Sequence, residues 1–129
     1  MYKFSKRSLE RMEGVDQRLL DIAHKAISIS KIDFGIPKTG GLRTASQQNE
    51  LFIKGLSQLD GVSKLSKHQS GKALDIYAYV DGKASWDPGY LAQVACAFFQ
   101  ASIDLGYDIE WGGLWKVFID GPHFELKES

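Results

Sequence analysis

The pattern of hydrophobic and polar residues predicts two helices in the first half of the chain. Between residues 15 and 30 the apolar positions recur at the spacing of an amphipathic helix with one buried stripe: Val15, Leu19, Ala23, Ala26 and Ile27. A second helix is predicted from about 45 to 54. Thr44 and Gln47 have the spacing of a capping box before it, and Gly55 is typical of the residue that ends a helix.

A third helix is predicted in the second half of the chain. Asp87 is a good capping residue, Pro88 suits the first helical turn, and Gly106 marks the end. Between them the apolar positions again follow helical spacing: Leu91, Val94, Ala95, Phe98 and Phe99. This segment is therefore expected to bury one face.

Strand-like patterns lie between and after these helices. Residues 31–37 form a short apolar run stopped by Pro37, and residues 73–80 alternate strictly. The alternation points one set toward a core (Leu74, Ile76, Ala78 and Val80) and the other set away from it (Asp75, Tyr77 and Tyr79). A strand of this kind is half buried.

The tail from residue 107 to 126 suggests two more short strands around a glycine-rich connection. In the last of these, Phe124 and Leu126 share one face, so His123 and Glu125 share the other. Helices in this order with short, antiparallel strands predict an α+β fold with a small antiparallel sheet packed against helices.

Composition narrows the class of protein. The chain has 129 residues, 43% hydrophobic and 25% charged, which suits one globular domain over residues 1–129. Sixteen basic residues balance sixteen acidic ones, so the overall charge gives no reason to expect a nucleic-acid partner. The single cysteine excludes an internal disulfide. No apolar run reaches the roughly 18–20 residues of a membrane span, and the N-terminus lacks a secretory signal, so we expect a cytoplasmic product.

Three residues suggest a metal site. His68, Asp75 and His123 offer two imidazoles and one carboxylate, and Asp75 and His123 lie on the outward faces of predicted strands. Catalytic zinc sites use three protein ligands of this kind and leave a further position for water, whereas structural zinc sites normally use four ligands rich in cysteine. By spacing alone, an ordinary surface loop is the more common setting for a histidine such as His68.

The whole run around these residues is more specific. Ser66-x-His68-x-x-Gly71-x-Ala73-x-Asp75 resembles, position for position, the first zinc motif of the D-Ala-D-Ala and L-Ala-D-Glu metallopeptidases. Asp120-Gly-Pro-His123 matches their second motif, a carboxylate three residues before a histidine. The segments GLRTASQQNELF, IDFGIP and IEWGGLW also look like the family, so the resemblance covers about residues 14 to 126. The chain looks most like the small phage endolysins that act as L-alanyl-D-glutamate peptidases.

The resemblance implies a fold and a site. It implies the compact fold shared with the hedgehog signalling domain, Zn²⁺ held by His68, Asp75 and His123, and Asp120 as the group that takes a proton from water and returns it to the leaving amine. Arg43 would hold a substrate carboxylate or the developing oxyanion. A salt bridge or a surface role beside the helix is the alternative interpretation of Arg43. Gly71 would provide the tight turn between the first two ligands.

The implied substrate is the stem peptide of peptidoglycan. The second motif departs from the carboxypeptidase branch, because Asp120 replaces a glutamate and Pro122 a tryptophan. This difference favours cleavage of the L-Ala–D-Glu bond for host lysis. We expect a monomer without a separate wall-binding domain, made in the host cytoplasm and acting in the periplasm after the inner membrane is breached. Two alternatives stay open: a D-Ala-D-Ala-type carboxypeptidase, and a non-catalytic zinc-bearing binding module.

Several other residues have two interpretations. Ser66 either supports a metal ligand or is a hydroxyl that stabilises its loop. Glu125 either supports a metal ligand or is a solvated charge on a strand. Trp111, Trp115 and Tyr77 either line the cleft or pack in the core or at its rim. His24 is expected to be exposed. Cys96, in an apolar helix, is expected to be a small buried hydrophobic residue.

Overall fold

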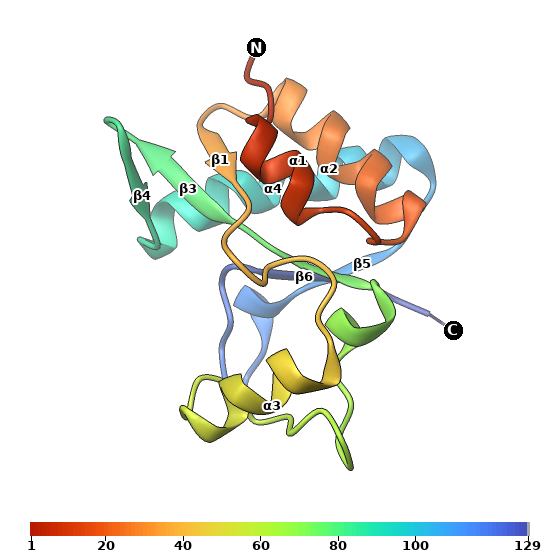
Figure 1. Cartoon of the computed structure of the whole chain (residues 1–129). Coiled ribbons are helices and arrows are strands. Elements are labelled where there is room, and N and C mark those ends of the chain that lie inside the picture. Colours follow the sequence, from red (N-terminus) through yellow and green to blue (C-terminus); the bar gives the residue numbers. More distant parts are fainter. Residues whose placement is uncertain (129) are drawn as a thin grey trace.

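A computed structural model describes residues 1–128, in which helices and two small antiparallel sheets alternate along the chain (Figure 1). The helices are α1 (Lys6–Arg11), α2 (Gln17–Ile29), α3 (Ala45–Ile53) and α4 (Pro88–Leu105), with short 3₁₀ turns η1 (Lys67–Ser70) and η2 (Gly112–Leu114). The strands are β1 (Asp33–Gly35), β2 (Ala73–Asp75), β3 (Tyr77–Val80), β4 (Lys83–Ser85), β5 (Ile109–Trp111) and β6 (His123–Leu126). The α+β prediction is confirmed.

The three predicted helices form because each has a local start signal. The side chains of Asp16 and Asp87 accept backbone N–H bonds at the starts of α2 and α4. At α3 both halves of the predicted capping box are present. Two elements were not predicted, α1 and β4, because they have only 6 and 3 residues and so carry little periodicity.

The predicted strand 73–80 is divided between the two sheets, and this division positions the site. β2 belongs to a sheet with strand order β2-β6-β5, and β3 to a sheet with order β1-β3-β4. The break falls at Ile76, whose backbone N–H donates to the carbonyl of Pro122 at 2.9 Å. The strands therefore form two sheets rather than the single sheet expected from the sequence.

The core lies where α2 and α4 meet the sheets. α2 and α4 run side by side on one side of the β6 sheet (Figure 1). Phe98 of α4 stacks on Phe124 of β6, with ring centroids 4.1 Å apart and an interplanar angle of 14°. Burying side chains of this size stabilises a fold by about 1.5–3 kcal/mol each. Phe124 and Leu126 thus anchor the strand that carries His123.

Cys96 is exposed, so the prediction that it is buried was wrong. The buried stripe of α4 runs through Val94, Ala95 and Phe98, and Cys96 lies one residue off this stripe on the outward face. The expectation for His24 is confirmed, since it is exposed on α2. Over residues 1–128, no helix combines the length and the hydropathy that crossing a bilayer requires.

Candidate metal centre

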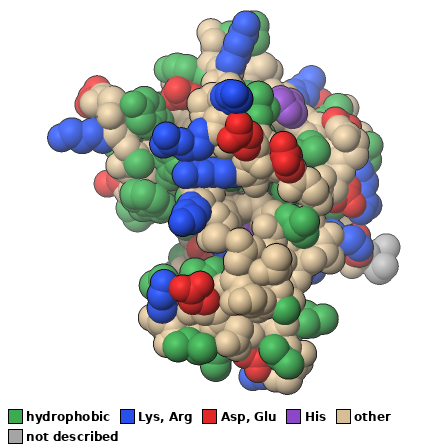
Figure 2. Space-filling model, viewed as in Figure 1, with side chains coloured by type: hydrophobic (Ala, Val, Ile, Leu, Met, Phe, Trp, Pro, Cys, Tyr) green, Lys and Arg blue, Asp and Glu red, His purple; other side chains and the backbone are tan. Residues whose placement is uncertain are grey.

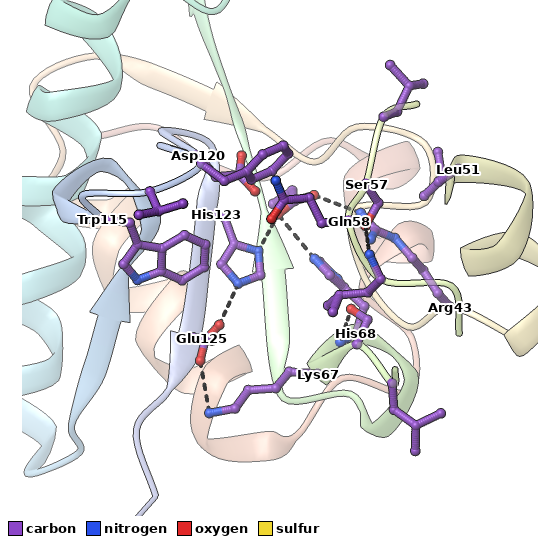
Figure 3. Close-up of a pocket in the computed structure, with 17 residues that line it drawn as sticks. Arg43, Leu51, Ser57, Gln58, Lys67, His68, Trp115, Asp120, His123 and Glu125 are labelled. Atoms are coloured by element: carbon purple, nitrogen blue, oxygen red, sulfur yellow. Dashed lines mark hydrogen bonds and ion pairs between the residues drawn. The ribbon is translucent and has the colours of Figure 1, made fainter. Parts of the chain in front are cut away.

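His68, Asp75 and His123 converge on one point, as the sequence predicted. Asp75 Oδ1 lies 3.2 Å from His68 Nε2 and 3.0 Å from His123 Nδ1, and the donor atoms of all three residues lie within 4.8 Å of one another. Figure 3 shows the two histidines in one pocket, with Glu125 bonded to His123. The register of the sheet explains part of this, because Asp75 of β2 stands directly opposite His123 of β6.

The short turn η1 brings His68 to the other two residues. Ser66 caps it by accepting the His68 backbone N–H at 3.2 Å. Gly71 ends it with φ 73°, and a side chain there would put a Cβ atom 2.6 Å from the carbonyl oxygen of Gly14. Gly71 therefore provides the expected tight turn. Ser66 holds the loop rather than contacting a ligand side chain directly.

The second nitrogen of each imidazole is held by the protein. His68 Nδ1 lies 2.9 Å from the carbonyl oxygen of Gly41, so it donates its proton there. His123 Nε2 lies 2.9 Å from Glu125 Oε1 and donates to that carboxylate. In the neutral rings these bonds leave the lone pairs of His68 Nε2 and His123 Nδ1 facing Asp75. Such outer hydrogen bonds fix the tautomer and orientation of metal-binding histidines.

Glu125 is part of this support rather than a solvated charge. Its side chain is 12% exposed and accepts from His123 and, at 2.9 Å, from Lys67 Nζ. Burial alone would raise the pKa of Glu125, but these two hydrogen bonds outweigh it and lower the pKa to about 2. Lys67 was missed by sequence reasoning, since nothing local connects it to a residue 58 positions away (125 − 67 = 58).

The charges of the centre depend on each other. Burial would raise the pKa of Asp75, but the two histidines outweigh it and hold this pKa well below its usual range. Burial would lower the pKa of His123, yet the hydrogen bonds to Asp75 and Glu125 raise it to about 9. In the metal-free protein this raised pKa favours the protonated form of His123 at neutral pH, so a metal ion that binds Nδ1 has to displace a proton.

The donor set fits a zinc ion. Two imidazole nitrogens and one carboxylate oxygen point at a common position, and both imidazoles have their remaining N–H groups bonded. Three ligands of this kind are the set that catalytic zinc sites use. Within residues 1–128, these three residues are the group of histidine, cysteine and acidic side chains whose donor atoms lie close enough together to hold a metal ion.

Arg43 is held by the protein. Its side chain is 10% exposed, and Nη2 donates to Asp75 Oδ2 at 2.9 Å. The same guanidinium donates to the carbonyl of Thr39 at 2.7 Å and to Gln48 Oε1 at 3.0 Å. Burial lowers the pKa of Arg43, and the Asp75 charge opposes this. The geometry thus makes Arg43 a salt-bridge partner that orients Asp75, and Arg43 also lines the cleft beside the centre.

Asp120 borders the same cleft without joining the ligand group. Burial raises the pKa of its carboxyl, and the nearby negative charge of Asp75 raises it further. The backbone holds it there: its N–H donates to the carbonyl of Gly112 at 3.0 Å, and its own carbonyl accepts the His123 N–H at 3.1 Å. A Cβ at Gly112 would lie 2.3 Å from the Asp120 carbonyl oxygen, so that approach requires glycine.

The cleft has a volume of about 420 Å³, and apolar residues line much of its wall. They come from the α3 side (Leu51, Leu56 and Leu65) and from the connection between η2 and β6 (Trp115, Val117 and Phe118). The Trp115 ring centre lies 5.1 Å from that of His123. Trp111 instead packs on Phe124 and donates to the Gly121 carbonyl, and Tyr77 lies in a separate groove. Of the three aromatic candidates, only Trp115 lines this cleft.

This α+β fold thus brings together a His-Asp-His group that could hold one metal ion and, beside it, the carboxyl group of Asp120, an arrangement typical of hydrolytic metal sites. Residues 1–127 match the family described as phage L-alanyl-D-glutamate peptidase, and the chain belongs to this family. The resemblance predicted from the motifs is confirmed.

Individual relatives agree with this membership. The chain is 35% identical to the L-alanyl-D-glutamate peptidase of Escherichia phage T5, over 99% of this chain and 91% of the phage protein. It is 29% identical to the peptidoglycan L-alanyl-D-glutamate endopeptidase CwlK of Bacillus subtilis (strain 168), over 68% of this chain and 58% of that protein. The crystal structure of the Serratia marcescens L-Ala D-Glu endopeptidase ChiX matches with a TM-score of 0.85 and 36% identity, covering 97% of this chain and 90% of ChiX.

Proposed function

We propose that this protein is a phage endolysin: a zinc-dependent peptidoglycan endopeptidase that hydrolyses the L-Ala–D-Glu bond of stem peptides during host lysis. The observation that carries the proposal is the convergence of His68, Asp75 and His123 beside Asp120, in a chain of the L-alanyl-D-glutamate peptidase family. The relatives named for this bond match over most of the chain.

Each residue has a part in the proposed chemistry. His68, Asp75 and His123 would hold the zinc, which when bound supplies a Lewis acid and an acidified water. Hydrolysis adds OH to the L-Ala carbonyl carbon and H to the D-Glu nitrogen as the C–N bond breaks. Asp120 would take the proton from the water and deliver it to that nitrogen, and its raised pKa suits a carboxyl that must alternate between both forms.

The supporting residues keep this arrangement fixed. Arg43 would hold Asp75 through Oδ2, leaving Oδ1 toward the two histidines. Glu125 and Lys67 would hold the His123 ring, and Gly41 the His68 ring. Preorganised groups of this kind lower the barrier because they need no rearrangement during the reaction.

The proposal extends to the setting of the reaction. Residues 1–129 would act as one catalytic domain and as a monomer, since every group of the site comes from one chain. The protein would be synthesised in the host cytoplasm and would reach peptidoglycan in the periplasm.

Product analysis tests the bond that is cut. Purified peptidoglycan incubated with the zinc-loaded protein should release peptides with D-Glu at the N-terminus and leave L-Ala on the muramyl sugar. Mass spectrometry with N-terminal labelling reads both products, and the Asp120→Asn protein is the matched control. Free D-alanine as the main product would assign the chain to carboxypeptidases instead. Absence of any cleavage by folded, zinc-loaded protein would favour a binding module.

A further inference from the structure

A second groove, of about 510 Å³, lies between α1 and the outer face of the β1-β3-β4 sheet. Its lining combines cations with tyrosines and one carboxylate: Lys3, Lys6, Arg7, Asp33, Tyr77 and Tyr79. Figure 2 shows Lys and Arg side chains gathered over the face of the molecule that carries α1. None of these residues takes part in the metal centre described above.

The groove has a fixed floor. In the β1–β3 register Asp33 stands opposite Tyr79, and Gly35 stands opposite Tyr77, so these residues share the outer face of the sheet. A Cβ at Gly35 would lie 2.5 Å from Tyr77 Oη, so the tyrosine ring lies across β1 only because residue 35 is glycine. Ser8 of α1 accepts the Ile36 backbone N–H at 3.0 Å and docks the helix beside this floor.

The three cations of the groove outnumber its one carboxylate, Asp33. Lys3, Lys6 and Arg7 are exposed, and within residues 1–128 none of them forms an ion pair. The whole chain has a formal net charge of zero, so this is a local excess of positive charge. Such an excess attracts an anionic partner over the distance that salt screening allows.

Exposed aromatic rings continue the floor. Tyr79 is 45% exposed and Trp86 is 54% exposed, and the Trp86 ring centre lies 5.9 Å from that of Tyr77. Exposed apolar rings that lie next to one another, rather than singly, are a feature of binding surfaces. The C–H faces of pyranose rings pack well against such rings, while tyrosine hydroxyls and a carboxylate accept bonds from sugar hydroxyls and amide N–H groups.

We infer that this groove binds a peptidoglycan strand at a distance from the bond being cut. Sugar rings would lie on Tyr79 and Trp86, stem-peptide carboxylates would meet Lys3, Lys6 and Arg7, and Asp33 would accept from hydroxyl or acetamido N–H groups. A phosphate polymer is a poorer match, because it carries an anion in every repeat and has no acetamido N–H groups for Asp33 to accept from. The inference rests on the proposed function. It adds a second substrate-binding site on β3, the strand that follows β2 along the chain. Tyr77 in this groove lies two residues after Asp75 of the metal centre.

Binding to insoluble peptidoglycan sacculi tests the groove. In an Asp120→Asn background, which keeps the sacculi intact, we compare Lys6→Glu/Arg7→Glu with a control pair of the same charge change, Lys31→Glu/Lys127→Glu. All four residues are exposed. Glutamate in the first turn of α1 suits the helix dipole, so the groove variant should fold. Two exposed charge contacts correspond to about a tenfold loss of affinity.

Co-sedimentation at several salt concentrations should show this tenfold loss for the groove pair and little change for the control pair. Tyr79→Ala should weaken binding several-fold and leave the salt dependence unchanged. Equal affinities for the two charge pairs would overturn the inference. The inference would also be overturned if duplex DNA or phosphatidylglycerol vesicles competed for the protein at the same concentration as the sacculi. Hydrolysis of a soluble stem peptide by the unmodified protein tests the proposed function separately, because it does not require binding to sacculi.

Discussion

The strands β2 and β3 are two halves of one alternating sequence, yet they build surfaces of opposite character. In β2, Asp75 is held by His68, His123 and Arg43, with a side chain only 16% exposed. In β3, Tyr77 and Tyr79 face an open groove whose cations are unpaired within residues 1–128. Only Ile76 separates the two halves.

The difference comes from the neighbouring strand and from what covers it. β6 places His123 opposite Asp75, and η1 covers the pair with His68. β1 offers only Gly35 and Asp33 opposite the tyrosines, and that face stays open to water. Polar groups that are buried must be satisfied by partners, whereas exposed ones already have water. Substitutions in the β2 half should therefore have large effects, and those in the β3 half small ones.

The largest effect is expected at the metal ligands. His123→Ala or Asp75→Ala should lose the metal and all measurable hydrolysis, because each removes one of only three donors. The loss of metal affinity should exceed the ~10–100-fold typical of removing an outer hydrogen-bond partner. Elemental analysis after gel filtration measures it, with Tyr79→Ala as the control from the other half. Full zinc occupancy in His123→Ala protein would show that the ligand set is wrong.

Asp120 should come next and should separate chemistry from metal binding. Asp120→Asn should keep zinc and the fold while turnover falls ~100- to 10,000-fold, since only proton transfer is removed. Single-turnover cleavage of a soluble stem peptide measures the rate, and metal analysis gives the control. Near-normal hydrolysis by this variant would remove Asp120 from the catalytic role.

Glu125 should have a smaller effect, because it acts through His123. Glu125→Ala should weaken zinc binding by ~10–100-fold. Glu125→Gln should recover part of the loss, since its amide oxygen still accepts from His123 Nε2. Competition with a chromophoric chelator gives the affinities, and thermal unfolding confirms that each variant folds. Unchanged affinity in both variants would mean that the 2.9 Å contact does not support the ligand.

The raised pKa of His123 predicts how the metal-free protein responds to pH. With a pKa of about 9 in the folded state against 6.5 in the unfolded chain, this group stabilises the fold fully below about pH 6.5. That contribution is lost as the pH rises through 9. Zinc must displace the same proton, so its affinity should increase with pH up to about 9. Calorimetry at pH 7 in buffers of different ionisation enthalpy should show proton release, and no release would contradict the predicted charge.

The smallest effect is expected in the β3 half. Tyr79→Ala should change the free energy of unfolding by less than about 1 kcal/mol, because it removes only a half-exposed cross-strand contact. Zinc content should not change at all. Urea unfolding followed by circular dichroism measures the stability, and a loss of several kcal/mol would mean that the two halves are not independent.

Local signals account for the parts of the fold that were predicted correctly. α2, α3 and α4 begin at side-chain caps, and a cap depends only on residues a few positions apart. The break at Ile76 has no such signal, because Leu74, Ile76 and Ala78 are all buried whichever sheet they join. What ends β2 is the Pro122 carbonyl, which is far away in the sequence.

The same distinction between local signals and distant contacts applies to the residues of the site. The three candidate ligands were predicted because their motifs match a known family, but the contacts that support them join distant segments. Arg43 was expected to meet substrate or to form a salt bridge; it lines the cleft and binds Asp75, a partner 32 residues away that no local pattern names. Lys67 was not considered, although it holds Glu125. Charge and residue type are visible in the sequence, whereas the partner of a charge depends on the folded arrangement.

Anomalous X-ray scattering at the zinc edge, from crystals of the zinc-loaded Asp120→Asn protein, would locate the metal and its ligands. We expect one strong peak per chain, bonded to His68 Nε2, Asp75 and His123 Nδ1, with Glu125 still bonded to His123 Nε2. A peak elsewhere, or zinc bound through His123 Nε2 with Glu125 displaced, would contradict this arrangement.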